Sequence, residues 1–185
     1  MRVIAGHLGG RRLRAPRGRM TRPTSDRVRE ALFSMLGPID GTSVLDLFAG
    51  TGALGIEALS RGAAKALFVE REGTAVAALR GNLAGLGLAE SQVQVMVGDA
   101  LAALRSAREA GETYDLVFVD PPYGQLREFE RELSALLPAV LASGARVVVE
   151  SDRRAPAELP LAVARRKRYG DTTITIHSTE DKDER

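Results

Sequence analysis

The stretch SVLDLFAGTGALGIEALSR, residues 43–61, predicts a β-strand, a glycine-rich turn and an α-helix in direct succession. Residues 43–48 form a short apolar run typical of a buried strand, and residues 53–61 have a helical pattern. The turn between them, GTGALG at residues 50–55, fits the pattern G-x-G-x-x-G, which brings backbone close to a nucleotide at a helix N-terminus. By itself the turn leaves a dinucleotide and an adenosyl compound equally open as ligands.

The alternation of strands and helices continues along the chain. Further apolar runs predict strands, and periodic segments between them predict helices; the strands are 66–70, 93–97, 115–120 and 145–151, and the helices are 74–86, 100–110 and 126–137. Apolar strands separated by helices indicate a parallel sheet covered on both faces. The last two runs, 161–169 and 172–178, are joined by Gly170 and Asp171 and predict a β-hairpin.

The first 40 residues differ from this alternation. RVIAG and RRLRAP flank HLGG and predict a small two-stranded ribbon, and residues 22–36 predict a helix with Thr24 or Ser25 as its N-cap. The first 30 residues carry nine arginines against Asp26 and Glu30. Guanidinium groups suit phosphate, but charge alone leaves a polyanion site and a solvated face equally open. We expect residues 1–40 to form a basic extension and residues 41–185 the main domain.

Composition narrows the class of protein. The chain has 185 residues, 44% of them hydrophobic and 27% charged, with a formal net charge of +2. It contains no cysteine, which excludes disulfides, thiolate zinc sites and iron–sulfur clusters. No apolar run reaches the ~20 residues of a membrane span, and the N-terminus lacks a signal-peptide pattern. We expect a cytoplasmic monomer without a metal site or a membrane contact.

Carboxylates follow three of the predicted strands and favour an adenosyl ligand. Asp46 precedes the glycine turn, Glu70 ends the next strand, and Asp99 closes the third in VGDA. An acceptor-rich pocket suits the ammonium, ribose diol and adenine amine of S-adenosylmethionine, whereas a pyrophosphate gains nothing from it. Asp46 would serve either a cationic ligand or the N–H groups of the glycine turn. Each acid taken alone is equally compatible with a helix cap or a solvated loop end.

The fourth strand ends in VFVDPPYG. Pro121 and Pro122 cannot continue a sheet ladder, so they fix Asp120 and Tyr123 at the carboxyl edge of the sheet, where open α/β folds bind ligands. Asp120 and a backbone carbonyl would accept hydrogen bonds from a planar amine, and Tyr123 would stack on its base. The alternative interpretation is that D-P-P-Y is only a strand terminator.

Together these stretches resemble an S-adenosylmethionine-dependent amino-methyltransferase, and more closely the RsmD family of bacterial 16S rRNA guanine-N2 methyltransferases. The resemblance lies in RVIAGHLGGRRLRAP, RPTSDRVREALFSML, LDLFAGTGALGIEALSRGA and FVDPPY, with Thr51 where the family typically has Ser; the C-terminal third matches only loosely, in Glu150 and the segment before Gly170. It implies a Rossmann-like class I methyltransferase fold, with a seven-stranded, mostly parallel sheet and a C-terminal antiparallel hairpin. It also implies S-adenosylmethionine as cofactor and 16S rRNA, in the small subunit or an assembly intermediate, as partner.

The expected site residues follow from these motifs and the resemblance. Those expected at the cofactor are Asp46, Phe48, Ala49, Gly50, Gly52, Glu70, Arg71, Asp99 and Ala100. The catalytic group is Asp120, Pro121, Pro122 and Tyr123. Arg11, Arg12 and Arg14 are expected to contact RNA phosphate, and Arg22 or Thr24 to line the mouth of the pocket.

Several alternatives are weaker. Pyrimidine C5 methylation uses a cysteine, ribose methylation uses a lysine near the sheet edge, and a dehydrogenase uses a proton-handling residue at the nicotinamide; the chain offers none of these in place. Protein glutamine methyltransferases usually carry Asn instead of Asp120. An adenine-N6 methyltransferase on RNA or DNA uses the same D-P-P-Y geometry and stays the main alternative. A non-catalytic rRNA-binding assembly factor is the alternative from another class of protein.

Overall fold

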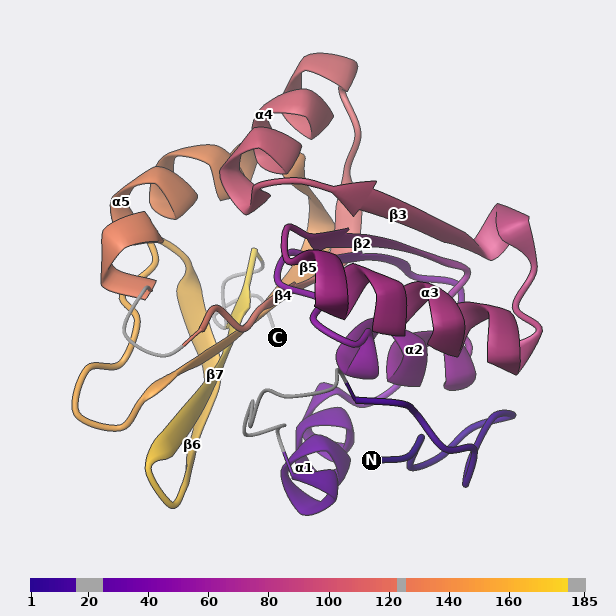
Figure 1. Cartoon of the computed structure of the whole chain (residues 1–185). Helices are drawn as coiled ribbons and strands as arrows, with labels where there is room; N and C mark the ends of the chain where they lie inside the picture. The colour runs from indigo at the N-terminus through magenta and orange to yellow at the C-terminus, as the bar shows by residue number, and fades with distance from the viewer. Residues whose placement is uncertain (16–24, 123–125, 180–185) are drawn as a thin grey trace.

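The computed structural model of the protein describes residues 1–15, 25–122 and 126–179. A seven-stranded sheet lies at its centre, with helices on both faces (Figure 1). The strands are β1 (Ser43–Asp46), β2 (Lys65–Glu70), β3 (Val93–Val97), β4 (Tyr114–Val119), β5 (Leu141–Asp152), β6 (Ala162–Tyr169) and β7 (Thr172–Ser178). The helices are α1 (Asp26–Leu36), α2 (Ala53–Ser60), α3 (Gly73–Leu86), α4 (Ala100–Ala110) and α5 (Leu126–Leu136), with short 3-10 turns at Glu90–Gln92 and Leu137–Val140.

The strand order is β3-β2-β1-β4-β5-β7-β6. The first five strands, β1, β2, β3, β4 and β5, pair in parallel with their neighbours within this set. β7 pairs antiparallel with β5, and β6 pairs antiparallel with β7. The predicted Rossmann-like class I methyltransferase fold is thereby confirmed, including the hairpin, in which Tyr169 faces Thr172 across the turn. The order reverses next to β1, and the crevice at such a point is where open α/β sheets bind ligands.

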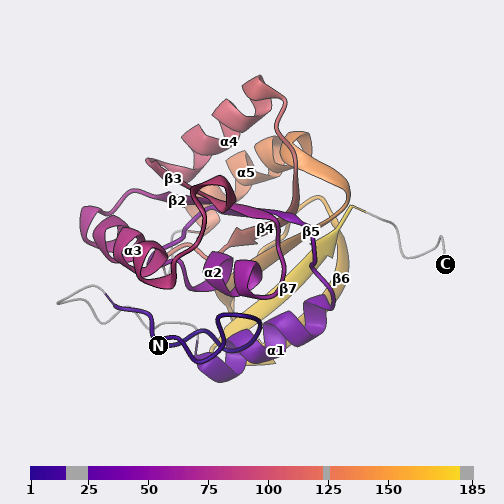
Figure 2. The same cartoon turned by 90° about the vertical axis from the view of Figure 1, so that its right-hand side faces the viewer.

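Two apolar layers cover the sheet. Helices α1, α2 and α3 pack on one face, with Leu32, Phe33 and Leu79 buried against strand residues such as Phe118. Helices α4 and α5 pack on the other face, with Leu104 and Leu133 fully buried; Figure 2 shows the two helix groups on opposite sides. Residues of successive strand positions alternate between the two layers, as the period of a β-strand requires.

The strand boundaries agree with the sequence prediction to within two residues except at β5, which begins at Leu141 and not at residue 145. Its first residues, LASG, have little β-propensity, and Gly144 has a positive φ of 70°. The pairing with β4 shifts register between Tyr114 and Leu116. An irregular pairing of this kind allows residues 141–144 to stay in the sheet, although their composition is typical of a loop.

The N-terminal ribbon is present as one antiparallel bridge, between Arg2 and Arg12. The bridge consists of hydrogen bonds from Val3 N to Arg11 O (2.9 Å) and from Leu13 N to Met1 O (3.0 Å), and a further bond runs from Gly10 N to Val3 O (2.9 Å). Helix α1 follows with Ser25 as its N-cap, whose hydroxyl accepts a hydrogen bond from the nitrogen of Val28. Val3, Leu8 and Leu13 of the N-terminal segment are buried in the same core as α1, α2 and α3.

Candidate active site

The glycine turn joins β1 to α2 through backbone conformations that residues other than glycine rarely adopt. Gly50 and Gly52 have φ values of 55° and 84°, in the region that favours glycine. A Cβ at Gly50 would meet no atom within 4 Å, so the backbone there faces open space. A Cβ at Gly55 would lie 2.3 Å from Cε1 of Phe68, which means that this glycine serves close packing of α2 on β2.

Asp46 lies beneath the turn and is only 1% exposed. Its Oδ2 accepts a hydrogen bond from the nitrogen of Gly55 at 3.1 Å, in the first turn of α2. Burial raises the pKa of Asp46 to about 7, with a further increase from the charge of Glu70, and hydrogen bonds from the Gly55 and Phe48 backbone oppose the shift. Of the two roles left open by the sequence, the structure shows the carboxylate bonded to the N–H of the glycine turn.

Glu70, at the end of β2, connects two loops at the edge of the sheet. Its Oε2 accepts a hydrogen bond from Gly50 N at 2.8 Å, and its Oε1 accepts from Arg71 N at 2.9 Å and Glu72 N at 2.8 Å. A carboxylate has lone pairs for about four hydrogen bonds, so these three leave capacity for another donor. The carboxylate therefore fixes the glycine turn and the start of α3 in one geometry.

The other expected cofactor residues surround this edge. Asp99 caps α4, with Oδ1 accepting from Leu101 N at 2.9 Å and Ala102 N at 3.2 Å. Phe48 is half-buried, with its ring centroid 6.0 Å from that of Phe129 on α5. The remaining members, Ala49 and Ala100, are buried, and Arg71 is exposed.

Asp120 follows β4 directly and begins the D-P-P turn. A cavity at this point is lined by Asp120, Pro121, Pro122, Leu126, Glu150, Ser151 and Asp152. Pro121 is buried and Pro122 exposed, so the first proline anchors the turn and the second faces solvent. Tyr123, the last member of the predicted catalytic group, lies outside the described residues.

Four carboxylates share one face of the sheet at its carboxyl edge. Val44, Phe68, Phe118 and Val148 all belong to the core beneath α1, α2 and α3. Two residues further along each strand come the acids Asp46, Glu70, Asp120 and Glu150. Since side chains alternate with a period of two, these acids occupy the same face, and the order β2-β1-β4-β5 makes them neighbours.

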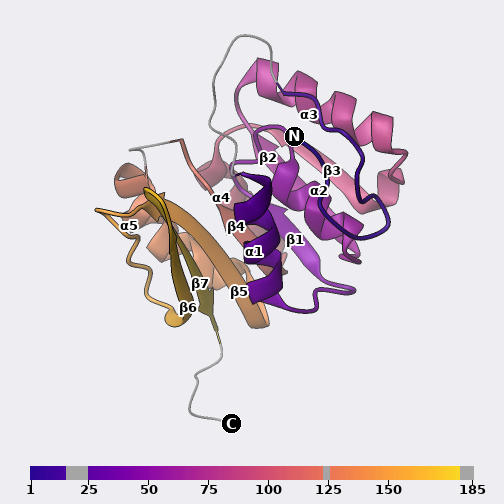
Figure 3. The same cartoon turned by 90° about the horizontal axis from the view of Figure 1, so that it is seen from below.

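The N-terminal segment packs along α2 and α3, as Figure 3 shows from below. On α2, the buried carboxylate of Glu57 accepts hydrogen bonds from Ile4 N (2.7 Å) and Ala5 N (3.0 Å) and pairs with Arg61 at 2.7 Å. On α3, Asn82 bonds both backbone polar groups of Arg14. The segment is thus held at two places by buried polar side chains.

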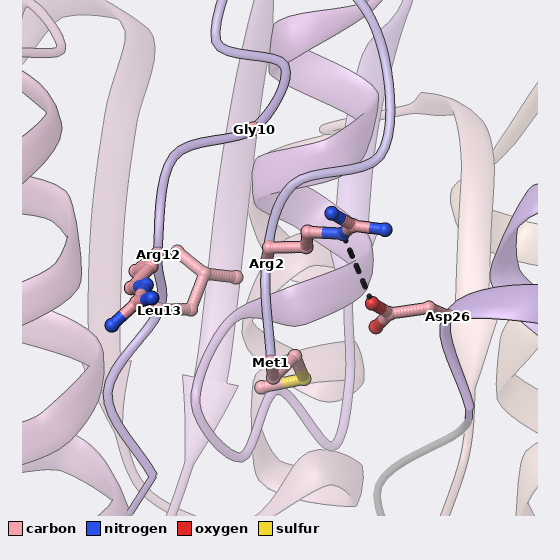
Figure 4. Close-up of a pocket in the computed structure, with 6 residues that line it drawn as sticks. All are labelled: Met1, Arg2, Gly10, Arg12, Leu13 and Asp26. Carbon is pink, nitrogen blue, oxygen red and sulfur yellow. Dashed lines mark ion pairs between the residues drawn. The ribbon is translucent and has the colours of Figure 1, made fainter.

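The three expected phosphate-contacting arginines, Arg11, Arg12 and Arg14, are all exposed. Arg11 donates from Nη2 to the carbonyl of Gly85 at the end of α3, at 2.9 Å. A second cavity lies between the N-terminal bridge and α1, lined by Met1, Arg2, Gly10, Arg12, Leu13 and Asp26. Figure 4 shows Arg2 pointing toward Asp26, 3.4 Å away, and Arg12 pointing away from that pair. The remaining two RNA candidates, Arg22 and Thr24, lie outside the described residues.

Comparison with known proteins identifies the family. Residues 1–178 match the family described as conserved hypothetical protein 95. Ribosomal RNA small subunit methyltransferase D of Haemophilus influenzae is 37% identical over 162 residues, which cover 86% of this chain and 83% of that protein. The chain belongs to the RsmD family of methyltransferases.

Other relatives are similar to this chain over nearly its whole length. YlbH of Bacillus subtilis is 42% identical over 188 residues, covering 96% of this chain and 98% of the relative. Among solved structures, yhhF of Escherichia coli superposes with a TM-score of 0.81 at 36% identity, covering 98% of this chain and 99% of that one. A hypothetical protein of Thermus thermophilus superposes with a TM-score of 0.80 at 31% identity, over 96% and 98% of the two chains.

Three polar residues of this RsmD-family chain were missed by the sequence analysis. Glu57, Asn82 and Arg29 are all buried, and each contacts the N-terminal segment. Asn82 had a detectable signal, because it lies on the face of α3 that also carries buried Leu79 and Leu86. A polar side chain on such a face requires partners, although its partners are not visible in the sequence.

Metal clusters and membrane spans are both absent from the described ranges, 1–15, 25–122 and 126–179. These ranges contain no group of three or more His, Cys, Asp or Glu side chains arranged to hold a metal ion. They also contain no helix with the length and apolar character needed to cross a membrane.

Proposed function

We propose that this protein transfers a methyl group from S-adenosylmethionine to the exocyclic N2 amine of a guanine in 16S rRNA of the small ribosomal subunit. The proposal is supported most by the row of carboxylates at the carboxyl edge of the sheet, which continues from the glycine turn to the D-P-P cavity. The name of the H. influenzae relative, ribosomal RNA small subunit methyltransferase D, supports the substrate.

The residues at the glycine turn fit the cofactor. The open space over Gly50 gives a nucleoside room to approach the backbone. Glu70 has remaining acceptor capacity for a ribose hydroxyl, and Oδ2 of Asp99, which is not used in capping α4, would accept from an adenine amine. When bound, S-adenosylmethionine supplies an electrophilic methyl group on sulfonium. Phe48, Ala49, Gly52, Arg71 and Ala100 complete the proposed surroundings.

Asp120 would act on the amine. The nitrogen lone pair of an exocyclic amine is delocalised into the base, so the amine is a poor nucleophile. Hydrogen bonds from its two N–H groups to Asp120 and to the Pro121 carbonyl return electron density to the nitrogen as it attacks. Asp120 would also accept the proton that the nitrogen loses. Pro121 and Pro122 hold this geometry, and Tyr123 stays the predicted stacking partner of a base that has left its stack.

Residues 1–40 would hold the RNA. Exposed Arg11, Arg12 and Arg14 lie on a segment that buried side chains, among them Glu57 and Asn82, fix beside α2 and α3. Phosphate contacts position a nucleic acid and give affinity that falls with salt. In this proposal residues 41–185 carry the chemistry, Arg22 and Thr24 stay predicted contacts at the pocket mouth, and the enzyme acts as a monomer in the cytoplasm.

The test incubates the protein and labelled S-adenosylmethionine with unmodified small subunits, with naked 16S rRNA and with duplex DNA. Nucleoside analysis by mass spectrometry should give N2-methylguanosine from one of the two rRNA substrates. N6-methyladenine, or label found only in DNA, would contradict the proposal and favour the adenine alternative. Absence of transfer to any substrate would favour a binding protein.

A variant separates chemistry from cofactor binding. Asp120→Ala should abolish transfer and leave the Kd for S-adenosylmethionine, measured by calorimetry, within about threefold of the unsubstituted protein. Glu70→Ala is the matched substitution at the cofactor end, and we expect it to weaken cofactor binding by about tenfold or more, since a charged hydrogen-bond acceptor is lost. If Asp120→Ala weakens cofactor binding as strongly, the assigned division of roles is wrong.

A further inference from the structure

Glu150 reaches the cavity at the D-P-P turn from the neighbouring strand. Val119 of β4 and Val149 of β5 are paired in register; Asp120 follows Val119 directly after β4 ends, and Glu150 is the next residue of β5. Both line the same cavity, together with Pro121. Neighbouring strands lie about 4.8 Å apart, so two acceptor side chains border one small space.

The face of the sheet gives the two acids a common direction. Val148 and Phe118, two residues earlier on each strand, are buried in the core beneath α1, α2 and α3. On its other side Glu150 pairs with Ile174 of β7, which is 1% exposed. Glu150 itself is half-buried, so its carboxylate stands at the boundary between this apolar layer and the cavity.

The Watson–Crick edge of guanine differs from that of adenine in a way that a carboxylate detects. Guanine presents an N1–H donor directly beside its N2 amine, whereas adenine presents the lone pair of N1 beside its N6 amine. A carboxylate is an acceptor only, so it bonds the first edge and repels the second. Enzymes that act on an extruded base read this edge by hydrogen bonds.

We propose that Glu150 selects guanine over adenine by accepting a hydrogen bond from guanine N1–H. Asp120 then accepts a hydrogen bond from the N2 amine that is methylated, so that each acid bonds a different N–H group of the guanine Watson–Crick edge. This inference rests on the proposed function, because it assumes that the amine held by Asp120 belongs to a nucleobase. It gives a physical reason for the choice between the two bases that the D-P-P-Y motif leaves open.

The test replaces the target guanine by 2-aminopurine, which keeps the N2 amine and lacks N1–H. The methylated nucleotide is first mapped on 16S rRNA, and the analogue is then introduced there by splint ligation of a synthetic oligonucleotide. We expect the unsubstituted enzyme to prefer guanine over 2-aminopurine by at least about 100-fold in kcat/KM, since a site built for an N–H rejects an analogue without it. Equal rates on the two bases would overturn the inference without any variant.

Glu150→Gln then assigns the preference to this side chain. An amide can turn its NH₂ toward the N1 lone pair of 2-aminopurine, so the preference should fall below about tenfold, with activity on 2-aminopurine kept or raised. Glu132→Gln, at an exposed position of α5, removes one negative charge away from the cavity and should keep the full preference. Retention of the preference in Glu150→Gln, or its equal loss in Glu132→Gln, would overturn the inference.

The two hypotheses fail in different ways. If the unsubstituted enzyme forms no N2-methylguanosine, the proposed function is wrong. If it forms N2-methylguanosine but discriminates against 2-aminopurine independently of Glu150, only the role of Glu150 is wrong. Circular dichroism and the Kd for S-adenosylmethionine verify that each variant is folded before rates are compared.

Discussion

Asn82 on α3 bonds both backbone polar groups of Arg14. Its Oδ1 lies 2.7 Å from the Arg14 nitrogen and its Nδ2 lies 3.1 Å from the Arg14 oxygen. The same Nδ2 donates to the carbonyl of Thr51, in the glycine turn, at 3.0 Å. One buried amide therefore fixes the basic N-terminal segment relative to the turn proposed to hold the cofactor.

Replacement of Asn82 by Leu keeps the volume and removes these hydrogen bonds. We expect a loss of about 1–3 kcal/mol in the free energy of unfolding and about tenfold weaker binding of 16S rRNA, because the segment carrying Arg14 loses its fixed position. Urea denaturation and fluorescence anisotropy measure the two effects. Ser60→Ala is the control, since Ser60 holds the segment at Ala5 and Leu8, away from the glycine turn. Equal weakening of rRNA binding by both variants would show that any loosening suffices.

Gly55→Ala tests the close approach of α2 to β2. The added Cβ would lie 2.3 Å from the Phe68 ring, and we expect a loss of about 1–3 kcal/mol from overpacking. Gly81→Ala, at an exposed position of α3, meets no atom within 4 Å and should instead stabilise the protein by about 0.5–1 kcal/mol. Both are measured by urea denaturation. Phe68→Leu should recover part of the Gly55→Ala loss, and strictly additive effects would contradict the contact.

The buried carboxyl of Asp46 makes stability depend on pH. Its pKa rises from an ordinary value of 3.8 to about 7 on folding, chiefly through burial. Between these pH values the folded state binds more protons than the unfolded state, so this group lowers stability as pH rises, by up to about 1.4 kcal/mol per pH unit. Asp46→Asn removes the titration and keeps an oxygen for Gly55 N. The free energy of unfolding of Asp46→Asn, measured by urea denaturation, should therefore rise relative to that of the unsubstituted protein from pH 5 to pH 8. A difference between the two proteins that does not change with pH would contradict the raised pKa of Asp46.

The double variant Arg11→Gln/Arg12→Gln tests the proposed RNA surface. Each phosphate contact adds about 1 to the slope of log K against log salt, so the slope should become shallower by about 2. Fluorescence anisotropy measures this slope from the binding of 16S rRNA between about 50 and 200 mM salt, a range over which phosphate contacts make affinity fall steeply. Arg105→Gln/Arg108→Gln on α4, on the opposite face of the sheet, is the charge-matched control. Identical slopes in both variants would remove the N-terminal segment from the interface.

The sequence determined most of the local structure. The glycine turn, the strand–helix alternation and the hairpin at Gly170-Asp171 were predictable, because turn conformation and side-chain periodicity depend on residues close in the chain. The acids Asp46, Glu70, Asp99 and Asp120 were predicted at strand ends for the same reason. The predicted start of β5 was wrong by four residues, since LASG has no strand pattern and stays in the sheet only through pairing with β4.

Tertiary structure alone decided which of these residues meet. The order β2-β1-β4-β5 brings Glu150 beside Asp120, although in the sequence Glu150 is only part of a loose C-terminal resemblance. Asn82 is hydrogen-bonded to Arg14, 68 residues away in the sequence, and Glu57 to Ile4, 53 residues away. Such partners are chosen by the burial of apolar faces, which turns particular polar groups toward one another after the layers have packed. Periodicity determines the face on which a side chain lies, and packing determines what it contacts there.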